Sequence, residues 1–124
     1  MKTNIINLIK LNLIYKKRKF RIKLNKNEFN LIKMLVKINL IKFIRKNKNS
    51  YDIYLNYLNN RPLFSNIINT NKSSKLIFIS NKKLKYITNK YKILLILNTN
   101  KGILTNFEAI NLKVGGIIIL KLWN

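Results

Sequence analysis

The sequence contains no cysteine and no histidine among its 124 residues. Disulfide bonds, zinc sites built from Cys and His, Ser-His triads and cysteine nucleophiles are therefore excluded. Only three acidic residues occur, Glu28, Asp52 and Glu108, and they lie far apart in the sequence. A hydrolase with paired carboxylates or a metal-dependent nuclease is not expected, so we predict no catalytic activity, no cofactor, no metal site and no small-molecule substrate.

Glycine and proline are scarce as well, with three copies and one copy, whereas Asn, Lys and Ile each occur 22 times. Such a bias is expected when AT-rich codons dominate, so a single lysine is weak evidence of function. Apolar runs such as Ile93–Leu97 are far shorter than the roughly 18 residues of a membrane span. We expect no membrane partner. No signal-peptide pattern opens the chain, which agrees with synthesis inside an organelle.

Positive charge is the dominant feature of what is present. The chain has 26 Lys and Arg and a formal net charge of +23. A free protein would carry this charge only with strong self-repulsion, so a polyanionic partner is expected. The length fits one domain or two small subdomains, and 48% hydrophobic residues are enough to form a core.

Four apolar residues near the start recur at helical spacing: Ile5, Leu8, Ile9 and Leu13. They predict a helix over residues 3–14, with Thr3 or Asn4 as its cap and Lys10 on its polar face. A basic run follows at residues 16–19. Phosphate contact is at least as well supported there as a solvated loop.

The next segment alternates strands with one helix. Residues 20–24 alternate in polarity and predict a half-buried strand. Asn25 and Glu28 have the spacing of a capping box, which predicts a second helix with an apolar stripe: Leu31, Met34, Leu35 and Ile38. Strands are predicted at 40–44 and 51–58, around a turn at 46–50, with a hairpin connection at 59–62. The tyrosines at 51, 54 and 57 are interpreted as sheet surface in preference to base-stacking residues.

The C-terminal part begins after a polar break at residues 69–75. We predict a strand at 76–80, a short basic helical turn at 82–89 and a buried strand at 91–97. A polar loop, Asn98–Gly102, is then followed by a short helix, because Thr105 and Glu108 repeat the capping-box spacing. The pair Gly115-Gly116 makes a turn into a closing apolar strand.

This closing stretch resembles the signature of the bacterial-type small-subunit ribosomal protein S-eight family. In that family a Ser-Thr-Ser-Lys-Gly loop precedes a helix with Glu-Ala or Arg-Ala, then Gly-Gly, an apolar strand and an aromatic end. The corresponding positions here are Asn98–Gly102, Glu108-Ala109, Gly115-Gly116 and Trp123. Three features depart from the pattern: Asn98 and Asn100 replace serines, Ile117 replaces a usual Glu, and Ser73-Ser74 replaces a Pro-Gly turn.

The resemblance implies an α+β fold and a role as a structural constituent of the small ribosomal subunit. A helix and sheet subdomain would cover residues 1–70, and a mostly antiparallel β subdomain with a short helix, residues 71–124, would bind rRNA. The expected partners are the central domain of small-subunit rRNA and neighbouring proteins such as S-five, S-two and S-seventeen. An organellar ribosome is implied, with the mitochondrion favoured over the plastid.

The candidate RNA-binding residues lie near the start, in the 72–75 segment and around the glycines: Thr3, Asn4, Lys10, Lys16, Lys17, Arg18, Lys72, Ser73, Ser74, Lys75, Asn98, Thr99, Asn100, Lys101, Gly102, Gly115 and Gly116. Asn and Thr side chains can bond base edges and 2′-hydroxyls, and glycines let backbone amides approach phosphates. Lys101 would neutralise a phosphate.

Two other kinds of protein would share the high charge. A basic architectural protein coating organellar DNA explains the lysines equally well, but gives no reason for the Asn-Thr-Asn-Lys-Gly and Gly-Gly motifs at this spacing. A cationic membrane-surface protein would need a long amphipathic helix, and the first predicted helix is too short.

Overall fold

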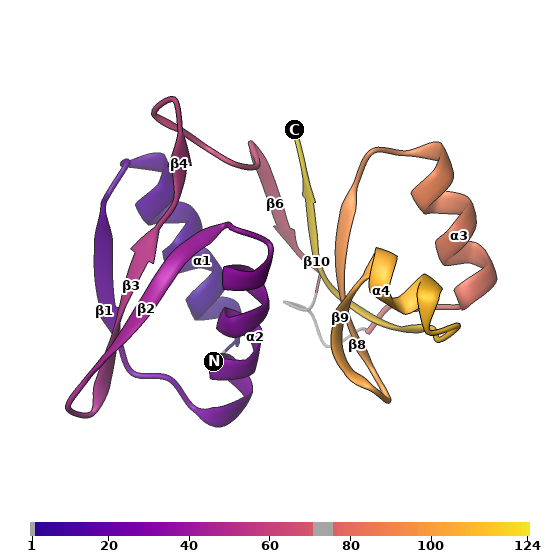
Figure 1. The fold of residues 1–124 in the computed structure, drawn as a ribbon, viewed down its shortest axis with the longest axis horizontal. Helices are drawn as coiled ribbons and strands as arrows, with labels where there is room; N and C mark the ends of the chain where they lie inside the picture. The colour runs from indigo at the N-terminus through magenta and orange to yellow at the C-terminus, as the bar shows by residue number, and fades with distance from the viewer. Residues whose placement is uncertain (1, 71–75) are drawn as a thin grey trace. The chain divides into compact units, whose positions relative to one another are not determined.

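The computed structural model describes residues 2–70 and 76–124, with side chains from residue 5 onward in those ranges (Figure 1). Helices and antiparallel sheets form the chain, so the α+β prediction is confirmed. Contacts divide it into two compact units, Met1–Phe64 and Ser65–Asn124. The division lies before the predicted boundary at residue 70, because strand β6 (Asn66–Asn69) pairs with the closing strand β10 (Gly116–Trp123).

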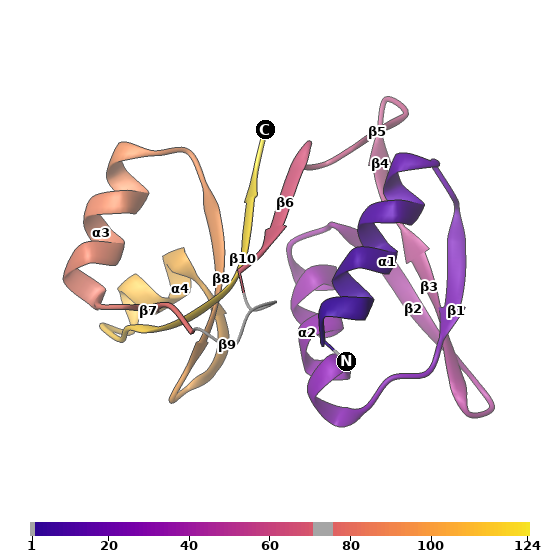
Figure 2. The same cartoon turned by 180° about the vertical axis from the view of Figure 1, so that it is seen from behind.

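The first unit contains two helices and three main strands, followed by a short hairpin: α1 (Lys2–Ile14), β1 (Lys19–Ile22), α2 (Lys26–Lys37), β2 (Ile41–Asn47), β3 (Ser50–Leu55), β4 (Tyr57–Leu58) and β5 (Arg61–Pro62). The main strands form an antiparallel sheet in the order β1-β3-β2. Helix α1 passes behind this sheet in Figure 1 and in front of it in Figure 2, so it covers one face. The core is aliphatic and includes Ile9, Leu35 and Ile53.

Both predicted helices of this unit are present. At α2 the capping box is complete: the Asn25 side chain accepts from the Glu28 amide at 2.8 Å, and Glu28 accepts from the Asn25 amide at 3.0 Å. Its predicted stripe is buried at Leu31, Met34 and Leu35. The cap predicted for α1 is wrong, because the helix already includes Lys2 and so places Thr3 and Asn4 inside its first turn.

Two turns fix the strands of the first unit. The β2–β3 connection is tighter than the predicted turn at 46–50, because β2 extends to Asn47 and β3 begins at Ser50. The hairpin predicted at 59–62 is confirmed, with Asn59 and Asn60 at φ 53° and 62° between β4 and β5. Two successive positive φ values are typical of the turn that matches strand twist in a two-residue hairpin, and Asn tolerates them.

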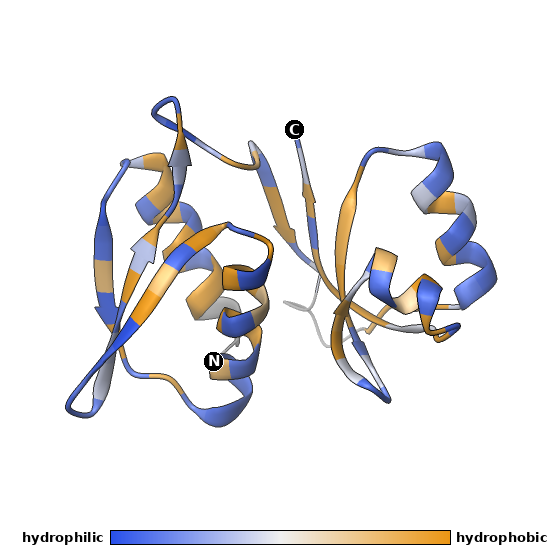
Figure 3. Cartoon of the chain, in the orientation of Figure 1, coloured by the Kyte–Doolittle hydropathy of each residue, from blue (hydrophilic) through white to orange (hydrophobic). Residues whose placement is uncertain are grey.

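The second unit contains two helices and five strands among the described residues: β6, β7 (Phe78–Ile79), α3 (Asn81–Lys90), β8 (Leu94–Thr99), β9 (Gly102–Thr105), α4 (Asn106–Asn111) and β10. The sheet order is β6-β10-β8-β9, and β7 also pairs with β10. Strands β8 and β10 are largely apolar along their length (Figure 3). A core forms where the helices meet the sheet, from Ile79, Leu84, Leu95, Leu97, Ala109 and Ile118.

Strand β9 is absent from the sequence-based prediction. Asn98 and Thr99, assigned to a loop, are the last residues of β8, and the chain re-enters the sheet at Gly102. A four-residue strand between a polar turn and a helix cap is too short to show a period of its own. The capping box that follows is confirmed, since Thr105 and Glu108 bond each other's backbone amides.

Within the described part of the chain, no helix has the length and apolar character that crossing a membrane requires. The same residues contain no cluster of acidic side chains that could hold a metal ion.

Candidate nucleic-acid interface

The central candidate is the hairpin formed by β8 and β9. Its register pairs Thr99 with Gly102 and Asn98 with Ile103, so Asn100 and Lys101 alone form the connection. Asn98, Asn100, Lys101 and Gly102 are exposed, and Thr99 is half-buried. The hairpin therefore presents amide side chains and one ammonium group to solvent, the donors and acceptors expected to contact RNA.

The Thr99 hydroxyl closes this hairpin. It donates to the Gly102 carbonyl at 2.8 Å and accepts from the Lys101 amide at 3.1 Å. Gly102 has φ +105°, a conformation that residues with a Cβ rarely adopt. Thr99 thus holds the turn in shape, a role that the sequence did not reveal, and it retains only limited capacity for a ligand.

The glycine pair acts through packing inside the protein. A Cβ on Gly116 would lie 2.6 Å from the Asn98 carbonyl oxygen and 2.8 Å from Cγ2 of Thr99. A Cβ on Gly115 would collide with the carbonyl of Ile79. The structure therefore brings the two glycine-bearing motifs together. Gly116 is buried and packs against the β8 side of the hairpin, at Asn98 and Thr99.

Helix α4 is tied to its neighbours by a buried amide. Asn106 is fully buried; its Oδ1 accepts from the Leu95 amide at 3.3 Å, and its Nδ2 donates to Thr88 Oγ1 at 2.9 Å and to the Ile93 carbonyl at 3.2 Å. A buried amide with all these partners fixes one arrangement of the helices on the sheet. The hairpin therefore projects from a rigid base.

The candidates of the first unit lie on α1 and just after it. Lys10 is half-buried on α1, while Lys16, Lys17 and Arg18 are exposed. The side chains of Thr3 and Asn4 are outside the described part, as are the candidates Lys72, Ser73, Ser74 and Lys75.

The turn that carries these basic residues is well defined. Lys16 has φ 54°, and the amides of Lys16 and Lys17 donate to the carbonyls of Leu13 and Asn12, the bonds of a Schellman helix end. The Tyr57 hydroxyl donates to the Lys17 carbonyl at 2.6 Å, and burial raises the pKa of Tyr57. The basic run is therefore a fixed turn with exposed charged ends.

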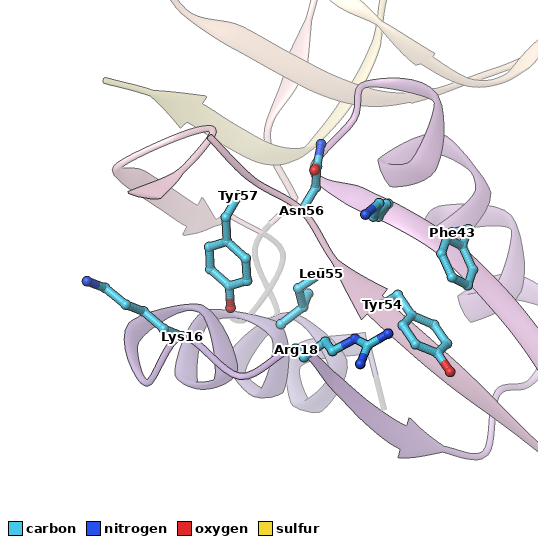
Figure 4. Close-up of a pocket in the computed structure, with 8 residues that line it drawn as sticks. Lys16, Arg18, Phe43, Tyr54, Leu55, Asn56 and Tyr57 are labelled. Atoms are coloured by element: carbon cyan, nitrogen blue, oxygen red, sulfur yellow. The ribbon is translucent and has the colours of Figure 1, made fainter. Parts of the chain in front are cut away.

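Sequence reasoning missed a second cluster, around Tyr54. Tyr54 is buried, not a surface residue, and its ring stacks on Phe43 with centroids 4.3 Å apart. Figure 4 shows the Tyr54 ring between Phe43 and the guanidinium of Arg18. The alternation of residues 51–58 places Tyr54 on the sheet, but its pairing with Phe43 depends on strand register.

The comparison with known proteins decides the family. The sequence model described as Ribosomal protein S8 matches residues 3–123, nearly the whole chain. The chain belongs to the ribosomal protein S8 family.

Relatives in the S8 family span both units. Small ribosomal subunit protein uS8m of Acanthamoeba castellanii is 33% identical over 122 residues, covering 97% of this chain and 96% of the relative. Small ribosomal subunit protein uS8 of Borrelia garinii subsp. bavariensis is 32% identical over 102 residues, with coverage of 81% and 76%. The same protein of Petrotoga mobilis is 32% identical over 91 residues, covering 69% and 67%. Membership in the S8 family makes this chain a structural protein of the small ribosomal subunit, in its organellar version.

Proposed function

We propose that the protein binds the central domain of small-subunit rRNA and stabilises its folded form during subunit assembly and translation. The observation that carries the proposal is the β8–β9 hairpin, which exposes Asn98, Asn100 and Lys101. The buried Gly116 packs against its Asn98 carbonyl, and the Thr99 hydroxyl closes its turn. Rigid display matters because RNA is recognised through irregular shape and 2′-hydroxyls, and a flexible loop would lose entropy on binding.

Charge supplies the remainder of the affinity. A net charge of +23 favours phosphate contact at many points, each releasing counterions from the RNA. Such contacts carry no sequence preference, so discrimination between RNAs falls to the hairpin. Lys16, Lys17 and Arg18 would therefore position the protein on the RNA backbone. Asn98 and Asn100 would distinguish the correct RNA from others.

We propose that the protein works in the mitochondrial ribosome, and its similarity to small ribosomal subunit protein uS8m of Acanthamoeba castellanii supports an organellar ribosome. Its neighbours there would be the proteins S-five, S-two and S-seventeen. The net charge of +23 also suits extensive contact with rRNA phosphates.

Co-sedimentation tests the proposal most directly. The tagged chain, expressed in cells whose mitochondria are then lysed, is expected to sediment with the small ribosomal subunit at moderate salt. In a second assay, purified protein is offered a central-domain rRNA fragment and duplex DNA of equal phosphate content. Preference for the rRNA fragment is expected; equal binding would mean that charge alone drives the interaction and would overturn the proposed recognition of the central domain.

A further inference from the structure

The first unit has a second surface suited to RNA, on one face of its sheet. Lys19 pairs with Tyr54, and Tyr54 pairs with Phe43, so these three side chains form one row across the strands. Residues two apart on a strand share a face. The next row on the same face is therefore Arg21, Asp52 and Arg45, which are also register partners. We call this the Tyr54 face.

An irregularity in β2 adds one more cation. The register passes from the pair Ile41 and Leu55 directly to the pair Phe43 and Tyr54, which leaves Lys42 as an extra residue. In a regular strand Lys42 and Phe43 would point to opposite faces. Here both line the same hollow, of about 300 Å³, because the bulge re-aims the side chain. Bulges of this kind are over-represented beside functional sites.

The aromatic pair offers one accessible ring. Tyr54 is only 8% exposed, and its partner Phe43 is 40% exposed. Arg18, Lys19 and Arg45 each approach the Tyr54 ring, with their charged ends 5.9, 5.5 and 6.0 Å from its centroid. A flat ligand can therefore extend the Tyr54–Phe43 stack from the open side of Phe43, within reach of these cations.

The cations on this face lack matching acids among the described residues. Asp52 is the one carboxylate of the Tyr54 face, and it already accepts from Arg21 at 2.8 Å. Like charges gathered around one ring repel one another, and a bound polyanion relieves that repulsion. The hollow is lined by Lys16, Arg18 and Lys42 next to Phe43 (Figure 4). Cationic groups that can bind phosphates and an aromatic ring that can stack on a base therefore share one site.

We propose that the Tyr54 face binds an unpaired nucleotide of single-stranded RNA, with its base stacked on Phe43 and its flanking phosphates on Lys16, Arg18 and Lys42. An acidic peptide would match the charge but would leave the exposed ring without a planar partner. Stacking on an aromatic ring beside a basic groove is how sequence-tolerant proteins hold single strands. The inference rests on the proposed RNA partner, but it uses the first unit and not the β8–β9 hairpin.

The test uses the full chain and a short single-stranded oligoadenylate that carries one 2-aminopurine, whose fluorescence is quenched by stacking. Phe43→Leu should weaken binding about fivefold or more and abolish the quench, because it removes the stacking surface but keeps an apolar side chain. Phe43→Tyr should restore both. Phe107→Leu, at an exposed phenylalanine of α4, is the matched control and should behave as the wild type.

A charge variant separates the two parts of the site. Lys42→Gln should lower the affinity yet keep the full quench at saturation, because the base still reaches Phe43. An unchanged quench and affinity in Phe43→Leu would overturn the proposal. Displacement of the oligonucleotide by polyglutamate as readily as by RNA of equal charge would overturn it too, and would point to an acidic protein.

The two RNA proposals fail separately. Loss of preference for the structured rRNA fragment with a normal oligoadenylate quench would remove the proposed function of the hairpin and leave the Tyr54 face in place. A normal preference for the rRNA fragment without any quench would remove the Tyr54 face alone.

Discussion

Gly116 lies directly against the backbone carbonyl of Asn98, which places the start of the closing strand under the β8–β9 hairpin. The adjacent register pair is Ile117 with Asn98. Because the contact is with backbone, no side-chain rotation can relieve it. The close approach of the two segments therefore requires the absence of a side chain at residue 116.

Gly116→Ala should consequently destabilise the protein by about 1–3 kcal/mol, the usual cost of overpacking. Chemical denaturation followed by far-UV circular dichroism measures the free energy of unfolding. Asn111→Ala, an exposed position at the end of α4, is the control and should change that free energy by less than about 0.5 kcal/mol. If Gly116→Ala were as stable as the control, β10 could move away from Asn98 of β8 at little cost in free energy.

Three helices end without glycine, although each uses a left-handed residue at its C-terminal end. Lys16, Asn39 and Lys113 have φ 54°, 68° and 58°. After α4, the amides of Lys113 and Val114 donate to the carbonyls of Ile110 and Ala109, the paired bonds of a Schellman end. In this glycine-poor chain, residues with a Cβ thus occupy the left-handed positions at helix ends where glycine is preferred.

Lys113→Gly is therefore expected to stabilise the protein by about 1 kcal/mol, because the left-handed conformation costs a residue with a Cβ about that much. Lys85→Gly, in the middle of α3, should instead destabilise it by about 1 kcal/mol, since glycine is a poor helix former. Thermal and urea denaturation of both variants measure the difference. If Lys113→Gly also destabilised the protein, the conformation of residue 113 would not be strained.

Local signals predicted much of this structure. The capping boxes at Asn25 and Thr105 and the Asn59-Asn60 turn act within a few residues, so their sequence patterns fix the geometry directly. Strand β9 escaped prediction because its existence depends on pairing with β8. The position of such a short strand is determined by its pairing with a neighbouring strand, and the local sequence pattern does not show which strands pair.

In the candidate site, too, features set by local sequence were predicted, and features set by strand pairing were not. The exposed Asn98, Asn100 and Lys101 were predicted from composition and motif, whereas the internal bonds of the Thr99 hydroxyl depend on hairpin register. The Tyr54 face was missed because a bulge brings Lys42 and Phe43 to one hollow. Alternation predicts opposite faces for these neighbours, so a pattern-based interpretation separates them.

The ion pair between Arg21 and Asp52 makes stability depend on pH in the acid range. The hydrogen bond from Arg21 lowers the pKa of Asp52 below its ordinary value of 3.8. A lowered carboxyl pKa stabilises the fold fully above the unfolded value, and this contribution is lost as the pH falls through the folded value. Wild-type protein should therefore lose stability relative to Asp52→Asn over the acid interval that begins near the ordinary carboxyl pKa of 3.8 and continues below it.

Urea midpoints of the two proteins, measured across that interval and at neutral pH, test this difference. Arg21→Gln should show the same reduced acid dependence, because it removes the group that lowers the pKa of Asp52. A constant difference between wild type and Asp52→Asn at every pH would contradict the ion-pair explanation.

Lys16 and Lys17 should bind phosphates without sequence preference. Replacing both by Gln is expected to reduce the slope of log affinity against log salt concentration by roughly 0.7 to 0.9 for each phosphate that is no longer neutralised. Relative affinity for different RNAs should stay the same. Lys82→Gln/Lys85→Gln on α3 is the charge-matched control; an equal change in slope there would mean that only total charge matters.

The hairpin prediction separates recognition from folding. Within the described residues Asn100 forms no side-chain hydrogen bond, whereas Thr99 holds the turn. Asn100→Ala should therefore leave the melting temperature unchanged but weaken binding to the rRNA fragment about fivefold, the effect of losing one hydrogen bond to the RNA. Thr99→Val keeps the shape of the side chain and loses both hydrogen bonds, so it should lower the melting temperature as well.

Filter binding of each variant to the rRNA fragment and to an arbitrary RNA duplex measures the loss of affinity on both RNAs. Equal losses on both RNAs in Asn100→Ala would show that the hairpin contributes affinity and no selectivity.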